Sequence, residues 1–309
     1  KKLELLQILY LIKETQSKIL KCVDCSIIFM SPQLSDTEIY EENYYYFNNY
    51  PEKSVKEDQI KSNFILKYIA SNFPEAKSIF DIGAATGIFL NESSKKGFKI
   101  NGMEISKAGC SIAESVFGIN LFCGSIEDYN KKIDSDIVIM TDVLEHTYNP
   151  DKTLNKIYQL TKKGAKIIIE TPNIGSFYYK IAGKKWVGFN QYHNFHFTKN
   201  SLIRLAENQN FKILSVFTTN FNILSAEGFW RTGLKDIIKS ILIKTNLLKT
   251  ITKINSFECT LNIKKISEIL LKKYKSNIFE KIFYYINFPI NKWANIKLSG
   301  DQIWIILEK

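Results

Sequence analysis

The chain has 309 residues, 45% of them hydrophobic, and carries a formal net charge of +11 at pH 7. This length and apolar content exclude a disordered chain and allow one large or two modest domains. The charge comes mostly from lysines scattered along the sequence, whereas a nucleic-acid-binding surface concentrates its basic residues on one face, so we expect no nucleic-acid partner.

The N-terminal lead, residues 1–50, opens with a predicted amphipathic helix over residues 1–14. Glu4 and Lys13 interrupt its apolar run and no small-residue cleavage site follows, which argues against a signal peptide. No stretch of the chain reaches the roughly 18 apolar residues that a membrane span requires. The five cysteines form an odd and sparse set. Such a set is typical of reduced thiols, so we expect a cytoplasmic protein.

Cys22 and Cys25 form the one C-x-x-C pair of the sequence, and Tyr44, Tyr45 and Tyr46 follow it. A single pair supplies two thiolates of a four-thiolate zinc site, or a redox dithiol. We predict no metal, because the sequence holds no second pair. The chain begins with Lys rather than Met, and an upstream pair in a longer chain would complete a zinc site. The tyrosines either close over a substrate or pack the lead on the core.

A helix and a buried strand are predicted next, within residues 54–82. Ser54 and Glu57 have the spacing of a capping box, and the apolar helical pattern ends near Asn72. The short apolar run Ser78–Ile82 then predicts a strand.

A glycine-rich turn follows this strand and begins another helix. Asp81, Gly83, Ala85 and Gly87 give the pattern D-x-G-x-A-x-G. Glycine permits positive φ and lets a ligand lie against the backbone, while the free N–H groups of a new helix favour negative charge. The turn therefore predicts a nucleotide-like ligand, although any strand-to-helix turn also needs glycine. The dinucleotide fingerprint G-x-G-x-x-G is absent, because the middle glycine is Ala85 and the last is Ile88.

This turn resembles motif I of the class I S-adenosylmethionine-dependent methyltransferases, with Ala85 in place of the usual middle glycine. The resemblance implies that Asp81, Gly83, Ala85 and Gly87 hold S-adenosylmethionine. Asp81 is expected to order the loop and to reach the methionyl amine through water or backbone. The implied fold is a Rossmann-like α/β methyltransferase fold. Its seven-stranded sheet is mostly parallel, and its last strand is antiparallel.

The second strand, predicted over Lys99–Glu104, ends in an acidic residue. Glu104 follows Gly83 by 21 residues, near the spacing at which an acid accepts hydrogen bonds from ribose hydroxyls. The alternative is an exposed glutamate that caps the helix predicted to begin at Ser106.

The third strand, predicted over Leu121–Cys123, leads into a polar turn. In the resembled family this turn contacts the adenine, which implies Ser125 and Ile126, with Glu127 as the other candidate. The same residues also make an ordinary helix N-terminus.

The fourth strand, predicted over Asp136–Thr141, runs into residues 142–146, with the sequence DVLEH. Ligands of parallel α/β sheets lie outside the carboxyl ends of the strands, so Asp142 should face the cofactor. The motif resembles the one that follows this strand in small-molecule O-methyltransferases. It lacks the Asn/Asp-Pro-Pro-aromatic sequence of enzymes that methylate amines and bases. The implied acceptor is a hydroxyl group.

A long aromatic segment, residues 171–200, follows a predicted helix from Pro150 and a strand over Ala165–Glu170. Long loops inside compact domains are usually functional. The segment resembles the loop beside the acceptor in the same family, which implies Trp186 and Tyr192 as substrate contacts. The alternative is that its aromatic residues belong to the core and its histidines cap the local backbone.

Four segments are therefore expected: the lead 1–50, a cofactor-binding core 51–218, a helical insertion 219–300 and a last strand 301–309. Within the core, Thr198 or Asn200 caps a helix that precedes a strand over residues 211–218. The insertion combines an apolar stripe with lysines. It either packs on its own domain or lies on the inner face of a membrane.

The sequence thus predicts a methyltransferase that modifies the hydroxyl of a sugar, a nucleotide-linked sugar or another small or lipid-linked molecule. His146, His193 and His196 are the candidate general bases, because the pKa of histidine lies near neutrality. Two alternatives are an RNA methyltransferase that uses the positive charge, and a non-catalytic module that binds a membrane or a protein partner.

Overall fold

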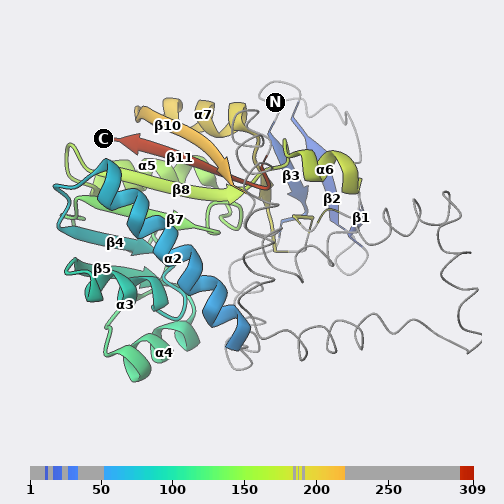
Figure 1. Ribbon diagram of the computed structural model, residues 1–309. Helices are drawn as coiled ribbons and strands as arrows, with labels where there is room; N and C mark the ends of the chain where they lie inside the picture. Colours follow the sequence, from blue (N-terminus) through green and yellow to red (C-terminus); the bar gives the residue numbers. More distant parts are fainter. Residues whose placement is uncertain are drawn as a thin grey trace, which may run out of the picture.

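The computed structural model describes residues 11–12, 17–22, 27–33, 52–183, 186, 188–189, 192–219 and 300–309. These residues form a seven-stranded sheet with helices on both faces and a smaller four-stranded sheet beside it (Figure 1). Cys25, the three consecutive tyrosines and residues 220–299 of the predicted insertion lie outside the described residues.

The large sheet has the strand order β10-β11-β8-β7-β4-β5-β6. The central strands are parallel to one another, and β11 is antiparallel to both of its neighbours. The predicted fold, with an antiparallel last strand, is therefore confirmed. The strands are β4 (Ser78–Ile82), β5 (Lys99–Glu104), β6 (Phe122–Cys123), β7 (Ile137–Thr141), β8 (Lys166–Pro172), β10 (Lys212–Thr219) and β11 (Gln302–Glu308).

Each face of the sheet carries its own layer of helices, because successive side chains of a strand point to opposite faces. In β7, Val138 and Met140 pack in one cluster with α5 and α7, while Ile137 and Ile139 pack in another with α2 and α3. Because β7 is buried on both faces, its sequence is a continuous apolar run rather than an alternation of apolar and polar residues. The helices are α2 (Glu52–Asn72), α3 (Ile88–Lys95), α4 (Lys107–Phe117), α5 (Pro150–Leu160), α6 (Phe177–Ala182) and α7 (Lys199–Asn208).

The caps of these helices confirm some of the predicted starts and correct others. The side chain of Ser106 accepts a hydrogen bond from the N–H of Gly109 at the start of α4, and Thr198 caps α7. Helix α2 begins at Glu52, so the predicted cap at Ser54 is wrong, because that residue already lies inside the first turn. None of the described helices is both long and apolar enough to cross a bilayer.

The small sheet joins the N-terminal lead to the aromatic segment. Its order is β1-β2-β3-β9, with every pairing antiparallel. Because residues 11–12 pair as a strand, the helix predicted over residues 1–14 is wrong at these two positions. Local apolar spacing suggested a helix there, whereas cross-strand pairing decided the structure. The strands are β1 (Leu11–Ile12), β2 (Ser17–Lys21), β3 (Ile28–Ser31) and β9 (Phe195–His196).

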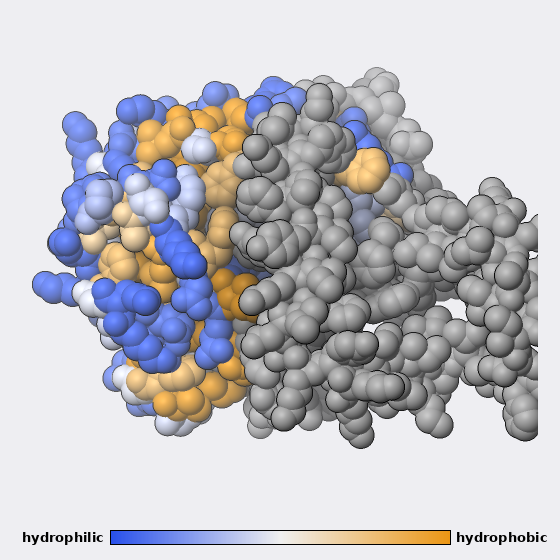
Figure 2. Space-filling model, in the orientation of Figure 1, coloured by the Kyte–Doolittle hydropathy of each residue, from blue (hydrophilic) through white to orange (hydrophobic). Residues whose placement is uncertain are grey.

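The small sheet buries its own apolar cluster against the aromatic segment. Ile19 and Met30 are fully buried and pack with Tyr178 and Trp186. The arrowheads of β4 and β8 point toward the side on which this sheet lies (Figure 1). The carboxyl ends of the parallel strands therefore face the aromatic segment. On the outer face that α2 crosses, apolar surface shows between hydrophilic side chains (Figure 2), and Ile60 of α2 is 61% exposed.

Candidate cofactor and acceptor site

The turn after β4 adopts the conformation for which its glycines were predicted. Gly83, Ala85 and Gly87 have φ values of 81°, 48° and 82°. The N–H groups of Gly83 and Ala84 both donate to the carbonyl of Met103, each at 2.9 Å. Ala85 holds its left-handed conformation at a cost of about 1 kcal/mol, since it has a Cβ atom. These hydrogen bonds attach the turn to β5, so its backbone conformation does not depend on a bound ligand.

We expect Gly83→Ala to weaken cofactor binding about tenfold, because a Cβ at Gly83 would lie 2.4 Å from Cγ2 of Val143 and would retain a left-handed φ. Titration calorimetry with S-adenosylhomocysteine measures the loss. The matched control is Gly118→Ala, where φ is 69° and nothing lies within 4 Å of the added atom. Equal cofactor affinity in the two variants would contradict the steric argument.

Glu104 is 5% exposed and holds the turn with both carboxylate oxygens. Oε2 accepts from the N–H of Ala85 and Oε1 from the N–H of Ser106, both at 2.8 Å. Burial raises its pKa, and these N–H groups partly oppose that effect. Each oxygen keeps a second lone pair that ribose hydroxyls could use. Glu104 is therefore a buried residue and not an exposed cap, although it accepts a hydrogen bond from the backbone N–H of Ser106, the residue that caps α4.

Asp81 is the next-to-last residue of β4, two residues before Gly83 of the turn, and is 4% exposed. Burial, and then the charge of Glu104, raise the pKa of Asp81 to about 7, while Lys61 acts in the opposite direction. A cationic ligand beside Asp81 would favour its ionised form. The position therefore suits the ammonium or sulfonium charge of the predicted cofactor.

The three candidate adenine contacts in the turn after β6 have different surroundings. Ser125 donates its hydroxyl to Oδ2 of Asp128 at 2.6 Å, and Ile126 is 6% exposed within the core. Oε1 of Glu127 accepts from the hydroxyl of Thr153 at 2.7 Å. The predicted adenine contacts therefore stay a prediction.

Lys61 of α2 is a site residue that the sequence reasoning missed. Its Nζ donates to Oδ2 of Asp142 at 2.6 Å and to Oε2 of Glu170 at 2.7 Å. Burial alone would lower the pKa of Lys61, but these two carboxylates raise it above its ordinary value. The sequence did contain a signal for this residue. Lys61 lies one helical turn before Ile65 and two turns before Ile69, so it falls on the buried stripe of the helix.

We expect Lys61→Met to lower the free energy of unfolding by about 3 kcal/mol, because it removes the ammonium group that pairs with Asp142 and with the fully buried Glu170. Urea unfolding measures this loss. Lys95→Met is the matched control, because Lys95 pairs with Glu92 on the surface with a side chain that is 59% exposed. That variant should change the free energy by no more than about 0.5 kcal/mol. Equal losses in both variants would contradict the assignment.

Two of the three histidines lie together just beyond β7. The rings of His146 and His193 are 4.7 Å apart. Nδ1 of His146 lies 2.8 Å from the carbonyl oxygen of Tyr192, and Nδ1 of His193 lies 2.9 Å from that of Gly188. A carbonyl oxygen only accepts, so each Nδ1 carries a proton and each Nε2 keeps its lone pair.

The electrostatic surroundings hold these imidazoles neutral. Burial lowers the pKa of His146, with opposing effects from Tyr192 and Asp142. Burial and the neighbouring histidines hold the pKa of His193 well below its usual range. His196 lies among Trp186 and other aromatic rings, and burial lowers its pKa to about 3. Both ring nitrogens of His196 lack a hydrogen-bond partner among the described residues.

Glu145 is a second residue that the sequence reasoning did not select. It is 1% exposed, and its Oε2 accepts from the hydroxyl of Thr171 at 3.0 Å. Burial raises its pKa well above the ordinary value, which favours the neutral acid. Glu145, His146 and His193 offer ligand atoms within 4.8 Å of one another, so these side chains could hold a metal. The absence of a metal stays a prediction.

A cavity of about 160 Å³ opens between the carboxyl ends of the strands and the aromatic segment. It brings together Asp142, Trp186 and His193, which were predicted separately. Neither Tyr192 nor His146, whose Nδ1 bonds the carbonyl oxygen of Tyr192, is among the described residues that line it. The described residues that line the cavity are Asp142, Pro172, Tyr178, Trp186, Gly188, His193, Asp301 and Gln302.

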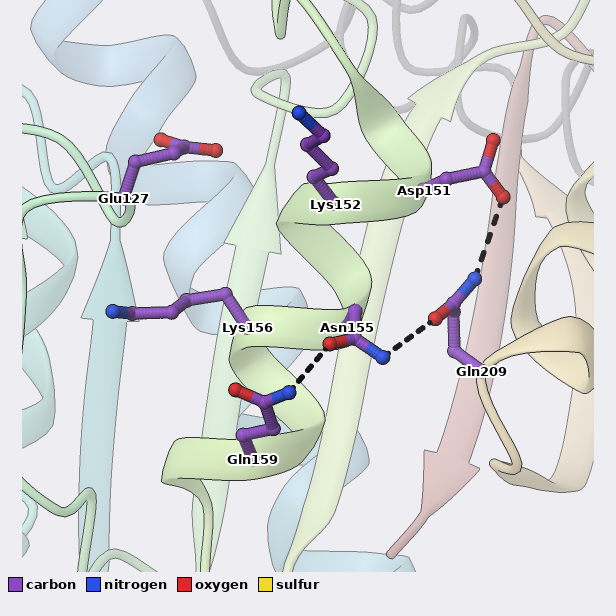
Figure 3. Close-up of a pocket in the computed structure, with 7 residues that line it drawn as sticks. All are labelled: Glu127, Asp151, Lys152, Asn155, Lys156, Gln159 and Gln209. Carbon is purple, nitrogen blue, oxygen red and sulfur yellow. Dashed lines mark hydrogen bonds between the residues drawn. The ribbon is translucent and has the colours of Figure 1, made fainter.

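A larger, more open depression of about 400 Å³ lies along α5. Its polar side chains bond one another, as in the chain from Gln159 through Asn155 to Gln209 and Asp151 (Figure 3). None of the predicted catalytic residues is among its described lining residues, and Glu127, the alternative candidate for the adenine contact, is the one predicted cofactor residue there. The smaller cavity is therefore the candidate acceptor site.

Comparisons with known proteins identify the family. Residues 59–216 match the family described as "Methyltransferase domain". A ubiquinone biosynthesis O-methyltransferase of Coxiella burnetii is 25% identical over 177 residues, which cover 52% of this chain and 75% of that protein. A ubiquinone biosynthesis O-methyltransferase of Rickettsia bellii is 26% identical over 208 residues, which cover 62% of this chain and 86% of that protein.

A solved S-adenosylmethionine-dependent methyltransferase of Thermotoga maritima aligns with a TM-score of 0.48 and 22% identity, over 59% of this chain and 85% of that one. The family match covers the turn after β4, Glu104 and the motif after β7, which were the features that predicted the cofactor. The chain belongs to the methyltransferase-domain family and is an S-adenosylmethionine-dependent methyltransferase.

Proposed function

We propose that the protein methylates a hydroxyl group of a small molecule, with a sugar as the acceptor. The observation that carries this proposal is the 160 Å³ cavity in which His193 and Asp142 meet. Relatives at 25–26% identity are named as O-methyltransferases, and the DVLEH sequence agrees with that reaction. Pockets for drug-sized ligands occupy about 300–1,000 Å³, so this cavity suits one ring better than a stretch of RNA.

His193 is the proposed general base. The cofactor supplies a methyl group on a sulfonium, which is already a good leaving group. With the cofactor bound, the acceptor oxygen would bond to the methyl carbon as the carbon–sulfur bond breaks, and the electron pair of that bond would stay on sulfur. Nε2 of His193 takes the hydroxyl proton, and its Nδ1–H stays on the carbonyl of Gly188. The remaining residues align the reactants and exclude water.

The proposal is tested by methyl incorporation from labelled S-adenosylmethionine into panels of sugars, other alcohols and RNA. We expect product with a small hydroxyl acceptor. Methylation of RNA alone, with binding that weakens steeply with salt, would favour the RNA alternative. No cofactor binding at millimolar concentration would overturn the proposal. A cytoplasmic location, and contact of residues 219–300 with a membrane surface, stay predictions.

A further inference from the structure

Two cysteines meet at the edge of the large sheet, and the proposed reaction uses neither of them. Cys110 lies near the start of α4, and Cys123 is the last residue of the edge strand β6. Both thiols are free, and α4 packs against β6. The two side chains are close enough to share a hydrogen bond. A helix and a strand therefore each place one thiol at the same point of the fold.

Both cysteines are attached to Glu104. Cys123 is the partner of Glu104 in the parallel pairing of β5 with β6. The Cys110 thiol donates to the carbonyl oxygen of Glu104, with a sulfur–oxygen distance of 3.3 Å. The same carbonyl oxygen accepts from the N–H of Gly124 at 2.9 Å. The thiol pair therefore lies beside the residue whose carboxylate holds the glycine turn.

The two thiols differ in their access to solvent. Cys123 is exposed, whereas Cys110 is half-buried. Burial, followed by the neighbouring Cys123, raises the pKa of Cys110. Since the thiolate is the nucleophile in thiol–disulfide exchange, Cys123 is the thiol that meets a reagent from solution. Cys110 reacts second, and its attack is intramolecular, which compensates for a low fraction of thiolate.

We propose that Cys110 and Cys123 form a modification site, which a small-molecule disulfide such as oxidised glutathione closes into a reversible disulfide that weakens cofactor binding. The sulfur of Cys123 attacks one sulfur of the reagent and releases one glutathione thiol. The sulfur of Cys110 then attacks the sulfur of Cys123 and releases the second. Two protein thiols are oxidised, the disulfide of the reagent is reduced, and the two thiol protons end on glutathione.

The effect on the cofactor follows from the position of Glu104. The disulfide removes the S–H donor of its carbonyl oxygen and joins α4 covalently to β6. The carboxylate of Glu104 bonds the N–H groups of Ala85 in the turn and of Ser106, which caps α4. A shift of α4 against β6 therefore changes the turn that holds the cofactor. This inference requires cofactor binding and does not depend on the acceptor.

Peptide mapping and calorimetry on the full chain test the proposal. The protein is equilibrated with oxidised glutathione at pH 8, and the remaining thiols are alkylated. Trypsin releases both cysteines on one peptide, residues 108–131, because no lysine or arginine lies between them. The closed form of this peptide is not alkylated, and cleavage after Glu114 leaves its two halves joined. S-adenosylhomocysteine should bind the oxidised protein about tenfold more weakly, and dithiothreitol should restore the affinity.

Three variants assign the effect to this pair. Cys110→Ser and Cys123→Ser cannot close the disulfide, so oxidised glutathione should leave their affinity for S-adenosylhomocysteine unchanged. Two variants keep the test decisive if one of them fails to fold. Cys22→Ser is the matched control, because it removes a cysteine of the N-terminal lead, and it should retain the tenfold loss. By linkage, saturating S-adenosylhomocysteine should lower the equilibrium constant for disulfide formation by the same factor.

Four results would overturn the inference: a mixed disulfide at Cys123 that never closes, a closed disulfide with unchanged cofactor affinity, an equal loss of affinity in both serine variants, or a loss that dithiothreitol does not reverse. Each of them leaves the proposed function standing. Failure of the reduced protein to bind S-adenosylhomocysteine would instead overturn the proposed function.

Discussion

We expect His193→Ala to lower kcat by about 10²–10⁴-fold with an unchanged Kd for S-adenosylhomocysteine, because general-base catalysis typically contributes that much. The reason lies in the geometry of the ring. Nδ1 of His193 is held by the carbonyl of Gly188, so Nε2 is the basic nitrogen, and the ring lines the acceptor cavity. Single-turnover methyl transfer and cofactor titration together separate the chemical step from binding.

His146→Ala and His196→Ala complete this comparison. His146 contacts the ring of His193, and His196 lies 6.2 Å from it, centroid to centroid. If only His146→Ala loses turnover, His146 and not His193 is the general base. Full activity in all three variants would show that none of these histidines is the base.

The pH dependence of kcat/KM gives a second measurement on the same residue. A general base works in its neutral form, and an unperturbed histidine has a pKa of about 6.5. Burial and the neighbouring His146 and His196 hold the pKa of His193 well below that value. Activity should therefore persist as the pH falls through 6.5 and should decline only at lower pH. A decline in kcat/KM centred above pH 6.5 would contradict a lowered pKa for the general base.

We expect Glu104→Ala to weaken binding of S-adenosylmethionine about 100-fold, because two hydrogen bonds from ribose hydroxyls to a carboxylate would be lost. The same change removes the acceptor for the N–H groups of Ala85 and Ser106. We therefore also expect a loss of about 2 kcal/mol in the free energy of unfolding, since unpaired buried donors are costly. Calorimetry and urea unfolding measure the two effects.

Two further variants control this prediction. Glu104→Gln keeps the size of the side chain and one acceptor oxygen while it removes the charge, so its affinity should fall between those of the wild type and Glu104→Ala. Glu92→Ala removes a partly buried glutamate of α3 that pairs with Lys95, and it should leave cofactor affinity unchanged. Wild-type affinity in Glu104→Ala would refute the ribose assignment.

The sequence alone determined the features that depend on local spacing. The strands β4 and β5 were predicted to the residue, because an apolar run between turn residues leaves few alternatives. The positive φ values of Gly83 and Gly87 followed from the glycines of the turn. The same turn predicted a nucleotide-like ligand, and its resemblance to motif I of the methyltransferases implied that this ligand is S-adenosylmethionine.

Only the tertiary structure decided which distant residues meet. Lys61 reaches Asp142 and Glu170 across 81 and 109 residues, and no local pattern names that pair. The three histidines were indistinguishable until their carbonyl partners and burial were known. Residues 11–12 became a strand because β2 pairs with them. The wall of the acceptor cavity likewise depends on the antiparallel pairing of β11 with β8, which brings Gln302 opposite Pro172.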